Sequence, residues 1–352
     1  MRSPSFTRRK ALAASGSLLT ASRLLPAQQL IGEPPGRIAP PNELVNAYEF
    51  GEMAKRKLGS ALYADIAPSD RGAMDRITFN PRMMVNTTKL NLSTQLFGDT
   101  LFTPIMIGPA SEQKRFHPEG ELAMARGAGA AQTGLVVSDR SSYPIDQIAG
   151  ETKQPIWYQV FPDSETGVSR ERVDRAIKAG CKAVIITAGV VEGPPGRPAP
   201  PTMVDWNLID RMRRGISVPV LIKGIMNPEQ AQVAVSRGMQ GIVVSNHTRR
   251  LVPHPESGIE ALPAIADAVG GKAPILVDGG FCRGSDVLKA LALGAQAILL
   301  CRAALWALAA YGAEGVENEL ALIQNELGRD MVMCGLVNTK SITRAAVKIH
   351  RR

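Results

Sequence analysis

Short runs of apolar, often β-branched residues recur along the chain, and amphipathic stretches separate them. The runs are TPIMIG (from Thr103), GLVVS (from Gly134), PIWYQV (from Pro155), AVIIT (from Ala183), VPVLIK (from Val218), GIVVSN (from Gly241), PILVD (from Pro274) and AILL (from Ala297). Continuous rather than alternating apolar runs are typical of strands covered on both faces, hence of a parallel sheet with crossover helices. The helical patterns between them are EGELAMARGA (from Glu119), RERVDRAIKA (from Arg170), PEQAQVAVSR (from Pro228) and DVLKALAL (from Asp286).

Eight strands, each followed by a helix or a connector, predict an α/β fold of the (β/α)8 type, a TIM barrel. A doubly wound open sheet is the structural alternative, but no GxGxxG motif follows the first strand. Before the barrel, NELVNAYEFGEMAKRKL (residues 42–58) predicts an amphipathic lead-in helix with an Asn cap.

The N-terminal segment has a composition of its own. SFTRRKALAASGSLLTA (residues 5–21) places paired arginines before a weakly apolar run of small residues, and Leu25-Pro26-Ala27 follows as a cleavage point. This pattern is typical of a Tat export signal, with a basic amphipathic tail as the alternative, and the run is too short for a membrane span. We therefore expect a signal peptide in residues 1–27, a linker and lead-in helix in residues 28–60, the barrel domain in residues 61–352, and a periplasmic or secreted protein.

Composition and charge argue against a disordered chain, a nucleic-acid-binding protein and a metal site. Among 352 residues, 45% hydrophobic and 21% charged residues are typical of a folded globular chain rather than a disordered one. The net charge of +9 draws on the N-terminal segment and the terminal arginines, and no basic stripe with interleaved aromatic residues appears, so no nucleic-acid partner is expected. Cys181, Cys282, Cys301 and Cys334 lack the spacing of a zinc site, so no metal is expected.

Polar residues follow the predicted strands. They are Ser138, Gln159, Thr187, Lys223, His247 with Arg250, Asp278 and Arg302. The carboxyl ends of the strands of such a barrel meet at one face, where the chemistry of these folds is found. We expect these side chains to converge there.

Three groups suggest chemistry at that face. His247 can take a proton near neutral pH, and Arg250 can hold a carboxylate through two parallel hydrogen bonds; a structural histidine at the rim is the alternative. Lys223, at the end of an apolar strand, needs an anionic or electron-rich partner, and could form a Schiff base or stabilise negative charge on a cofactor; a surface salt bridge is the alternative. The paired glycines in PILVDGGFCRGSD (residues 274–286), with Arg302 after the last strand, predict a phosphate site, or a mere tight turn.

With these motifs the chain resembles the FMN-dependent α-hydroxy-acid oxidase and dehydrogenase family, from about Asn46 to Thr343. The motifs that carry the resemblance are PIMIGPA (from Pro104), Gln113-Lys114 with HPEGE (from His117), YQVF (from Tyr158), VLIKGI (from Val220), IVVSNH (from Ile242), LVDGG (from Leu276), RGSDVLKALALGA (from Arg283), Cys334-Gly335 and Ser341-Ile342. Each motif is short, but together, in this order and at barrel spacing, they form a strong signal.

The resemblance implies an oxidation of a 2-hydroxy acid in which His247 takes the proton, Arg250 holds the substrate carboxylate and FMN accepts the electrons. Lys223 would lie beside the flavin and stabilise its reduced, anionic form. The flavin ring would be held by Pro109, Ala110, Ser138, Gln159 and Thr187. The ribityl chain and phosphate would be held by Asp278, Gly279, Gly280, Arg283 and Arg302.

The departures from the family pattern concern the substrate more than the flavin. His247 is followed by Thr248-Arg249-Arg250 instead of small residues, and Gly189 stands where an aspartate would orient the histidine. Two tyrosines expected to bind substrate are replaced by Asp65 (with Tyr63 nearby) and Phe161. A second arginine after the fourth strand has no clean counterpart, Arg197 being only near, and Cys282 replaces an arginine after the paired glycines.

Flavin binding is therefore the firmer prediction and turnover of lactate or glycolate the weaker one. The alternatives are a flavoprotein that has lost hydroxy-acid chemistry, or a barrel enzyme of another class, such as a flavin-dependent isomerase. A quinone, a cytochrome or oxygen is the expected electron acceptor, and a homo-tetramer is an expectation that rests on the resemblance alone.

Overall fold

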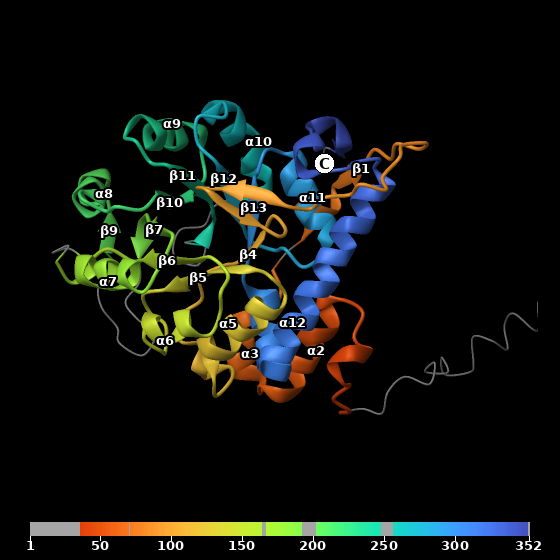
Figure 1. Ribbon diagram of the computed structural model, residues 1–352, viewed down its shortest axis with the longest axis horizontal. Helices are drawn as coiled ribbons and strands as arrows, with labels where there is room; N and C mark the ends of the chain where they lie inside the picture. Colours follow the sequence, from red (N-terminus) through yellow and green to blue (C-terminus); the bar gives the residue numbers. More distant parts are fainter. Residues whose placement is uncertain (1–35, 70, 164–166, 192–201, 248–255, 351–352) are drawn as a thin grey trace, which may run out of the picture. The chain divides into compact units, whose positions relative to one another are not determined.

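Eight parallel strands close into a barrel in the order β10-β11-β12-β13-β4-β5-β6-β7 (Figure 1). The structure, a computed structural model, describes residues 36–69, 71–163, 167–191, 202–247 and 256–350. The chain divides into two compact units, Met1–Ile38 and Ala39–Arg352, and the barrel belongs to the second. The predicted (β/α)8 fold is confirmed.

The barrel strands coincide closely with the apolar runs of the sequence. They are β4 (Ile105–Ile107), β5 (Gly134–Ser138), β6 (Ile156–Val160), β7 (Ala183–Thr187), β10 (Val220–Ile225), β11 (Gly241–Val244), β12 (Ile275–Asp278) and β13 (Ala297–Leu300). Around them lie the helices α5 (Gly120–Ala130), α6 (Ile145–Gly150), α7 (Gly167–Lys178), α8 (Trp206–Arg213), α9 (Pro228–Ser236), α10 (Gly258–Val269), α11 (Gly284–Ala292) and α12 (Arg302–Met333). Because helices cover the outside and side chains fill the inside, almost every strand residue is buried.

The barrel interior is a packed core and not a channel. Its inward-facing side chains are Met106, Val136, Trp157, Ala183, Ile185, Leu221, Val243, Leu276, Ala297 and Leu299. A hairpin of β2 (Thr94–Leu96) and β3 (Asp99–Leu101) closes the end where the strands begin. The Phe97 ring in its turn meets the Trp157 ring edge-on, with 5.5 Å between centroids. One end being closed, ligands can enter only at the end where the strands finish.

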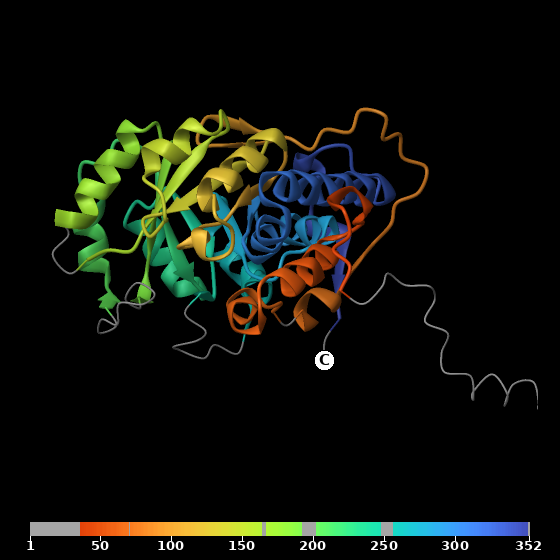
Figure 2. The ribbon, with the colours of Figure 1, turned by 90° about the horizontal axis from the view of Figure 1, so that it is seen from below.

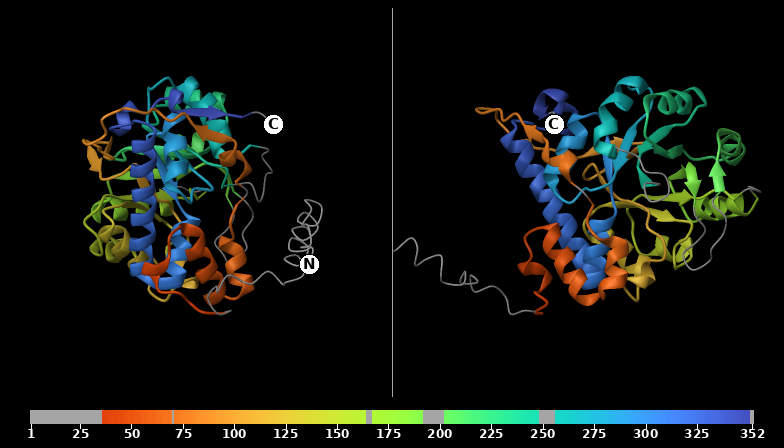
Figure 3. Two further views of the ribbon diagram at one scale, coloured as in Figure 1. Left: turned by 90° about the vertical axis from the view of Figure 1, so that its right-hand side faces the viewer. Right: turned by 180° about the vertical axis from the view of Figure 1, so that it is seen from behind.

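The segments before and after the barrel pack together beside it. Helix α2 (Ala47–Lys57) lies against α12 (Figure 2), and β1 (Ile77–Phe79) pairs antiparallel with β14 (Val347–Ile349) near the C-terminus (Figure 3). Short helices α3 (Ser60–Ile66) and α4 (Gly72–Asp75) link α2 to β1. After β7, a small hairpin is formed by β8 (Gly189–Val191) and β9 (Thr202–Val204).

The lead-in helix begins later than the sequence predicted. Residues Pro41–Glu43 form a separate 3-10 turn, and α2 starts at Ala47. Its cap is Asn46, whose side-chain oxygen accepts hydrogen bonds from the backbone N–H groups of Tyr48 and Glu49. The helix belongs to the same compact unit as the barrel, so the boundary expected at residue 60 does not separate two units. The expected signal peptide, residues 1–27, lies outside the described residues.

Within the described residues, none of the helices combines the length and apolar character needed to cross a membrane. The same part of the chain contains no cluster of three histidine, cysteine or carboxylate side chains that could hold a metal ion.

Candidate active site

A ring of polar and small side chains lines the open end of the barrel. Successive side chains of a strand point to opposite faces, so the residue two positions after an inward-facing one also points inward. The pairs are Val136 and Ser138, Trp157 and Gln159, Ile185 and Thr187, Leu221 and Lys223, Val243 and Ser245, Leu276 and Asp278, and Leu299 and Cys301. The packed core therefore dictates which strand residues reach the mouth. Of the side chains predicted to converge there, this row contains Ser138, Gln159, Thr187, Lys223 and Asp278, whereas Arg250 lies outside the described residues.

Lys223 is tied to its neighbours on the ring. Its Nζ lies 2.9 Å from Asp278 Oδ2 and donates a hydrogen bond to Ser245 Oγ at 2.8 Å. On the other side of the mouth, Gln159 Nε2 donates to Thr187 Oγ1 at 2.8 Å. All five side chains are buried, where a charge persists only if it is paired. The mouth thus holds one cation and one carboxylate in contact.

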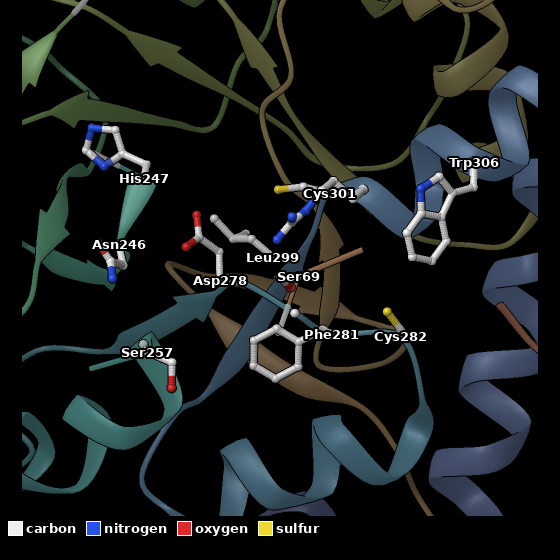
Figure 4. Close-up of a pocket in the computed structure, with 14 residues that line it drawn as sticks. Ser69, Asn246, His247, Ser257, Asp278, Phe281, Cys282, Leu299, Cys301 and Trp306 are labelled. Atoms are coloured by element: carbon white, nitrogen blue, oxygen red, sulfur yellow. The ribbon is translucent and has the colours of Figure 1, made fainter. Parts of the chain in front are cut away.

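A cavity of about 530 Å³ opens beside this ion pair. It is lined by residues that follow β11, β12 and β13, and by the start of α12: Ser69, Asn246, His247, Ser257, Gly258, Asp278, Gly279, Gly280, Phe281, Cys282, Leu299, Cys301, Arg302 and Trp306. Figure 4 shows His247 and Trp306 at opposite ends, with Asp278 and Cys301 between them. The volume is that of a site for a small molecule.

His247 packs against the backbone of neighbouring strands. Gly224, in β10, has a φ of +109°, and a Cβ there would lie 2.9 Å both from Cε1 of His247 and from the carbonyl oxygen of Ala188. Only glycine fits this position, because the backbone conformation and the space both exclude a side chain. The imidazole is therefore placed by the bulge in β10 as well as by its own strand.

The imidazole is neutral at neutral pH. Burial, followed by the nearby positive charge of Lys223, lowers the pKa of His247 to about 3, against a smaller opposite influence of Asp278. Neither ring nitrogen has a hydrogen-bond partner among the described residues. Gly189, at the position expected to carry an aspartate partner, has a φ of +95°, a conformation that an aspartate adopts only with strain.

The other end of the cavity suits an anion. Gly279 and Gly280 have φ values of +100° and +79°, which turns the chain sharply after β12. Arg302 is the first residue of α12, and the N-terminus of a long helix attracts negative charge. Cys282 and Cys301 also line this end, and burial raises the pKa of both thiols to about 12, so they add no negative charge.

Arg283, predicted to bind the cofactor, does not line the cavity. Its guanidinium forms an ion pair with Glu326 of α12 at 2.7 Å. Arg71, which the sequence did not single out, supports the glycine turn instead. It forms two hydrogen bonds of 2.8 Å with Asp286 and donates a third to the Gly280 carbonyl oxygen.

Of the residues predicted to bind substrate, Asp65 and Phe161 do not line this cavity. Asp65 forms an ion pair with Arg115. Phe161 directly follows β6, and the Arg140 guanidinium lies over its ring, 4.0 Å from the centroid. Pro109 and Ala110 follow β4, and the Ala110 carbonyl oxygen accepts a hydrogen bond from Gln113. Thr248, Arg249 and Arg250 lie outside the described residues, and so does Arg197.

Arg140 was not singled out by the sequence, because β5 ends at Ser138 and the alternation of the strand does not extend to the turn that holds Arg140. Arg71 had no signal either, because its partners Gly280 and Asp286 lie more than 200 positions away in the chain.

The site fits FMN. The buried side chains of Ser138, Gln159 and Thr187 would offer hydrogen bonds to a neutral ring system, and Lys223 would offer positive charge. Arg302 at the N-terminus of α12 would hold the phosphate, at one end of a cavity of suitable volume.

Comparison with known proteins agrees with this geometry. The model of the family described as FMN-dependent dehydrogenase matches residues 64–192 and 198–349. The chain belongs to this family. The predicted family and its cofactor, FMN, are confirmed, whereas the roles given to single residues stay predictions.

Several relatives in the FMN-dependent dehydrogenase family resemble the chain over nearly its whole length. It is 33% identical to the peroxisomal (S)-2-hydroxyacid oxidase GLO3 of Arabidopsis thaliana, over 87% of this chain and 97% of that protein. It is 32% identical to the L-lactate oxidase of Nostoc sp., over 85% and 96%. A solved structure of mandelate oxidase matches with a TM-score of 0.82 and 33% identity, over 88% and 100%.

The low pKa of His247 predicts that folding stability falls in acid. A free imidazole titrates at a pKa of 6.5, whereas His247 stays neutral in the folded protein down to about 3. At a pH between these two values, the unfolded state binds one more proton than the folded state. Through His247, the free energy of unfolding therefore falls by up to about 1.4 kcal/mol for each unit by which the pH drops. Urea denaturation of the flavin-free protein should show a steeper loss of stability below about pH 6 for wild type than for His247→Gln.

Asp139 has the opposite effect on how stability changes with pH, and this effect cancels when wild type is compared with His247→Gln. Burial raises its pKa to about 6, so its influence weakens the folded state as the pH rises, equally in both proteins. Equal slopes of unfolding free energy against pH for wild type and His247→Gln would contradict a buried, neutral His247.

Proposed function

We propose that the chain oxidises a 2-hydroxy acid to the 2-oxo acid, with FMN as its cofactor. The observation that carries this proposal is the neutral, buried imidazole of His247 in the same barrel mouth as the Lys223–Asp278 ion pair. The oxidation removes two electrons and two hydrogens from the hydroxy acid. It requires a base, a fixed positive charge and a cavity that holds the cofactor.

The chemistry divides between the residues and the cofactor. FMN, when bound, would supply the acceptor for the two electrons and the hydrogen that leave C2 of the substrate. His247 takes the hydroxyl proton, since its imidazole is unprotonated, and the two broken bonds are replaced by the C=O bond of the product. Lys223 holds positive charge at the centre of the mouth, where negative charge accumulates during the reaction.

The His247 pKa of about 3 makes it a weak base in the empty site. An anionic substrate beside the ring raises this pKa, because the carboxylate stabilises the imidazolium. Proton transfer is then coupled to binding. Arg250, three residues beyond His247 in the sequence, is the proposed clamp for the substrate carboxylate.

The positions expected to contact the substrate lack the groups that would bind a small hydroxy acid. Gly189 supplies no carboxylate to His247, Phe161 supplies no hydroxyl, and Asp65 is occupied by Arg115. Each missing positioning group typically costs a few kcal/mol of transition-state stabilisation. We therefore propose a substrate other than lactate or glycolate.

The N-terminal segment adds a location to the proposal. Arg8 and Arg9 before a weakly apolar run support Tat export and a periplasmic or secreted enzyme. A quinone or cytochrome would then reoxidise the flavin, with oxygen as a further acceptor. A homo-tetramer is proposed from the family resemblance alone.

The test of the activity is reduction of the flavin without oxygen. Protein expressed without residues 1–27 and loaded with FMN should lose its visible flavin absorption when a 2-hydroxy acid is added. His247→Gln should bind FMN as tightly as wild type does. Its flavin should be reduced at least about 100-fold more slowly, because general-base catalysis contributes that much.

His350→Gln is the matched control, because this exposed histidine pairs with the Thr78 hydroxyl near the C-terminus and does not line the cavity. A yellow protein that no member of a broad 2-hydroxy-acid panel bleaches would favour the alternative of a flavoprotein without this chemistry.

The export proposal predicts dependence on the paired arginines. The full chain expressed in a bacterium with a Tat system should appear in the periplasmic fraction, and Arg8→Lys with Arg9→Lys should leave it in the cytoplasm. Periplasmic protein from the double variant in equal amount would argue against a Tat signal.

A further inference from the structure

A cluster of exposed apolar side chains lies away from the mouth of the barrel. It consists of Met83, Met84, Val85, Val332 and Met333, and we call it the methionine patch. Met83 is 82% exposed and Met84 fully exposed, and the other three are between 40% and 60% exposed. Of the nine large apolar side chains that the described residues expose, five belong to this patch. Such a concentration on one part of a surface marks a site that contacts another molecule.

The two segments that form the methionine patch pack against each other. A Cβ at Gly335, just beyond α12, would lie 2.8 Å from Cγ2 of Val85 and 2.9 Å from the carbonyl oxygen of Arg82. Figure 1 and Figure 2 both show the loop after β1 beside the C-terminal end of α12. The cavity of the candidate site lies at the other end of this helix, where Arg302 and Trp306 line it. The patch is therefore one surface, separate from the site.

The local backbone brings the two segments together and turns the methionines outward. Gly335 has a φ of +65°, and a side chain there would meet the loop after β1, so glycine alone allows this close approach. Met84 has a φ of +64°, which means that the chain turns at the two methionines. In a strand, successive side chains point to opposite faces, and one of the two would then reach the interior. The turn leaves both exposed.

The chain around the methionine patch is basic. Residues 76–98 and 331–350 contain no aspartate and no glutamate. The carboxylates of α12 nearest in sequence, Glu326 and Asp330, are almost buried and pair with Arg283 and Arg329. The lysines and arginines of the two ranges are Arg76, Arg82, Lys89, Lys340, Arg344 and Lys348.

Three of these cations lie beside the methionine patch. Arg82 and Lys89 flank the methionines in the loop after β1. Lys340 lies next to that loop, since the hydroxyl of the neighbouring Thr339 donates a hydrogen bond to the Ser93 carbonyl oxygen at 2.7 Å. All three side chains are exposed, and no carboxylate of the described residues forms an ion pair with them. They are available to an anionic partner.

This combination fits the surface of a membrane better than a protein or a nucleic acid. Methionine is unbranched and has no hydrogen-bond donor that needs a partner, so it enters a headgroup layer without leaving a polar group unpaired. Two copies of the chain that met through this same patch would bring their unpaired cations together, and these repel each other. The patch also contains none of the aromatic side chains on which single-stranded nucleic acids stack.

We propose that the methionine patch docks the protein on the surface of a membrane that contains anionic lipids. Met83 and Met84 enter the headgroup layer, and Arg82, Lys89 and Lys340 lie against the lipid phosphates. This role goes beyond the proposed function and does not depend on it. A docked protein would share its membrane with a quinone acceptor.

The test measures binding to vesicles. The FMN-loaded full chain is mixed with vesicles of phosphatidylcholine alone, or of phosphatidylcholine and phosphatidylglycerol in equal parts, and the fraction that floats with the lipid is measured. We expect binding to the anionic vesicles to weaken at high salt and to exceed binding to the neutral vesicles at least about tenfold. A repeat without residues 1–27, which keeps the whole unit Ala39–Arg352, prevents the basic N-terminal segment from hiding the effect.

The apolar contribution is tested by a double variant. Met83→Ser with Met84→Ser should weaken binding to the anionic vesicles about 10- to 100-fold, because two apolar side chains no longer leave water. Val45→Ser with Val168→Ser is the matched control, since it removes two exposed apolar side chains outside the patch and should leave binding unchanged. Retained FMN content shows that each variant is folded.

The charge contribution has its own pair of variants. Lys89→Gln should weaken binding to the anionic vesicles about fivefold, the contribution of one cation at an anionic surface. Lys153→Gln removes an equal charge from an exposed position between α6 and β6 and should leave binding unchanged.

Equal binding of wild type to neutral and anionic vesicles, or no binding to either, would overturn the proposal. Unchanged binding of the double methionine variant would overturn it as well. Light scattering without lipid tests a second copy of the chain as the partner: if Met83→Ser with Met84→Ser lowers the molar mass in solution, the patch is a subunit interface and the proposal is wrong. None of these measurements uses flavin reduction, so their outcome is independent of the proposed function.

Discussion

The alternation of side chains along eight parallel strands is the constraint on which the rest of this structure depends. Every strand that fills the core with residues such as Leu221 and Leu276 must send the residue two positions later to the mouth. Packing the core therefore sets Lys223 against Asp278, a contact of 2.9 Å between strands that are far apart in the chain. A shift of one strand by one residue along its axis would turn its whole inward-facing row away from the site.

The mouth has two halves with different chemical character. Around β12, β13 and α12 it offers a glycine turn, a helix N-terminus and Arg302, which suit the phosphate of a cofactor. Around β6 and β7 the predicted family pattern is altered at Phe161 and Gly189. Gly189 has a φ of +95°, a conformation that a residue with a side chain adopts only with strain. The expected departures from the family therefore lie on the opposite side of the mouth from the glycine turn and Arg302.

Much of the fold could be predicted because continuous apolar runs mark buried parallel strands. The hairpin that closes the barrel could not, since strands of three residues carry too little pattern. The lead-in helix was placed too early because Asn42 and Asn46 both suit a cap, and the sequence does not show that Asn42 belongs to a separate 3-10 turn, Pro41–Glu43. In the site, Arg283 was assigned to the cofactor because nothing in the sequence shows that Glu326, 43 positions later, pairs with it.

We propose that the open end of the barrel holds FMN through its phosphate, at Arg302 and the start of α12. A fluorescence titration of flavin-free protein, expressed without residues 1–27, tests this by comparing FMN with riboflavin, which lacks the phosphate. FMN should bind about 10- to 100-fold more tightly, because its phosphate would meet a cation and a helix N-terminus. Equal affinities, or no binding of either flavin, would show that this phosphate site is wrong.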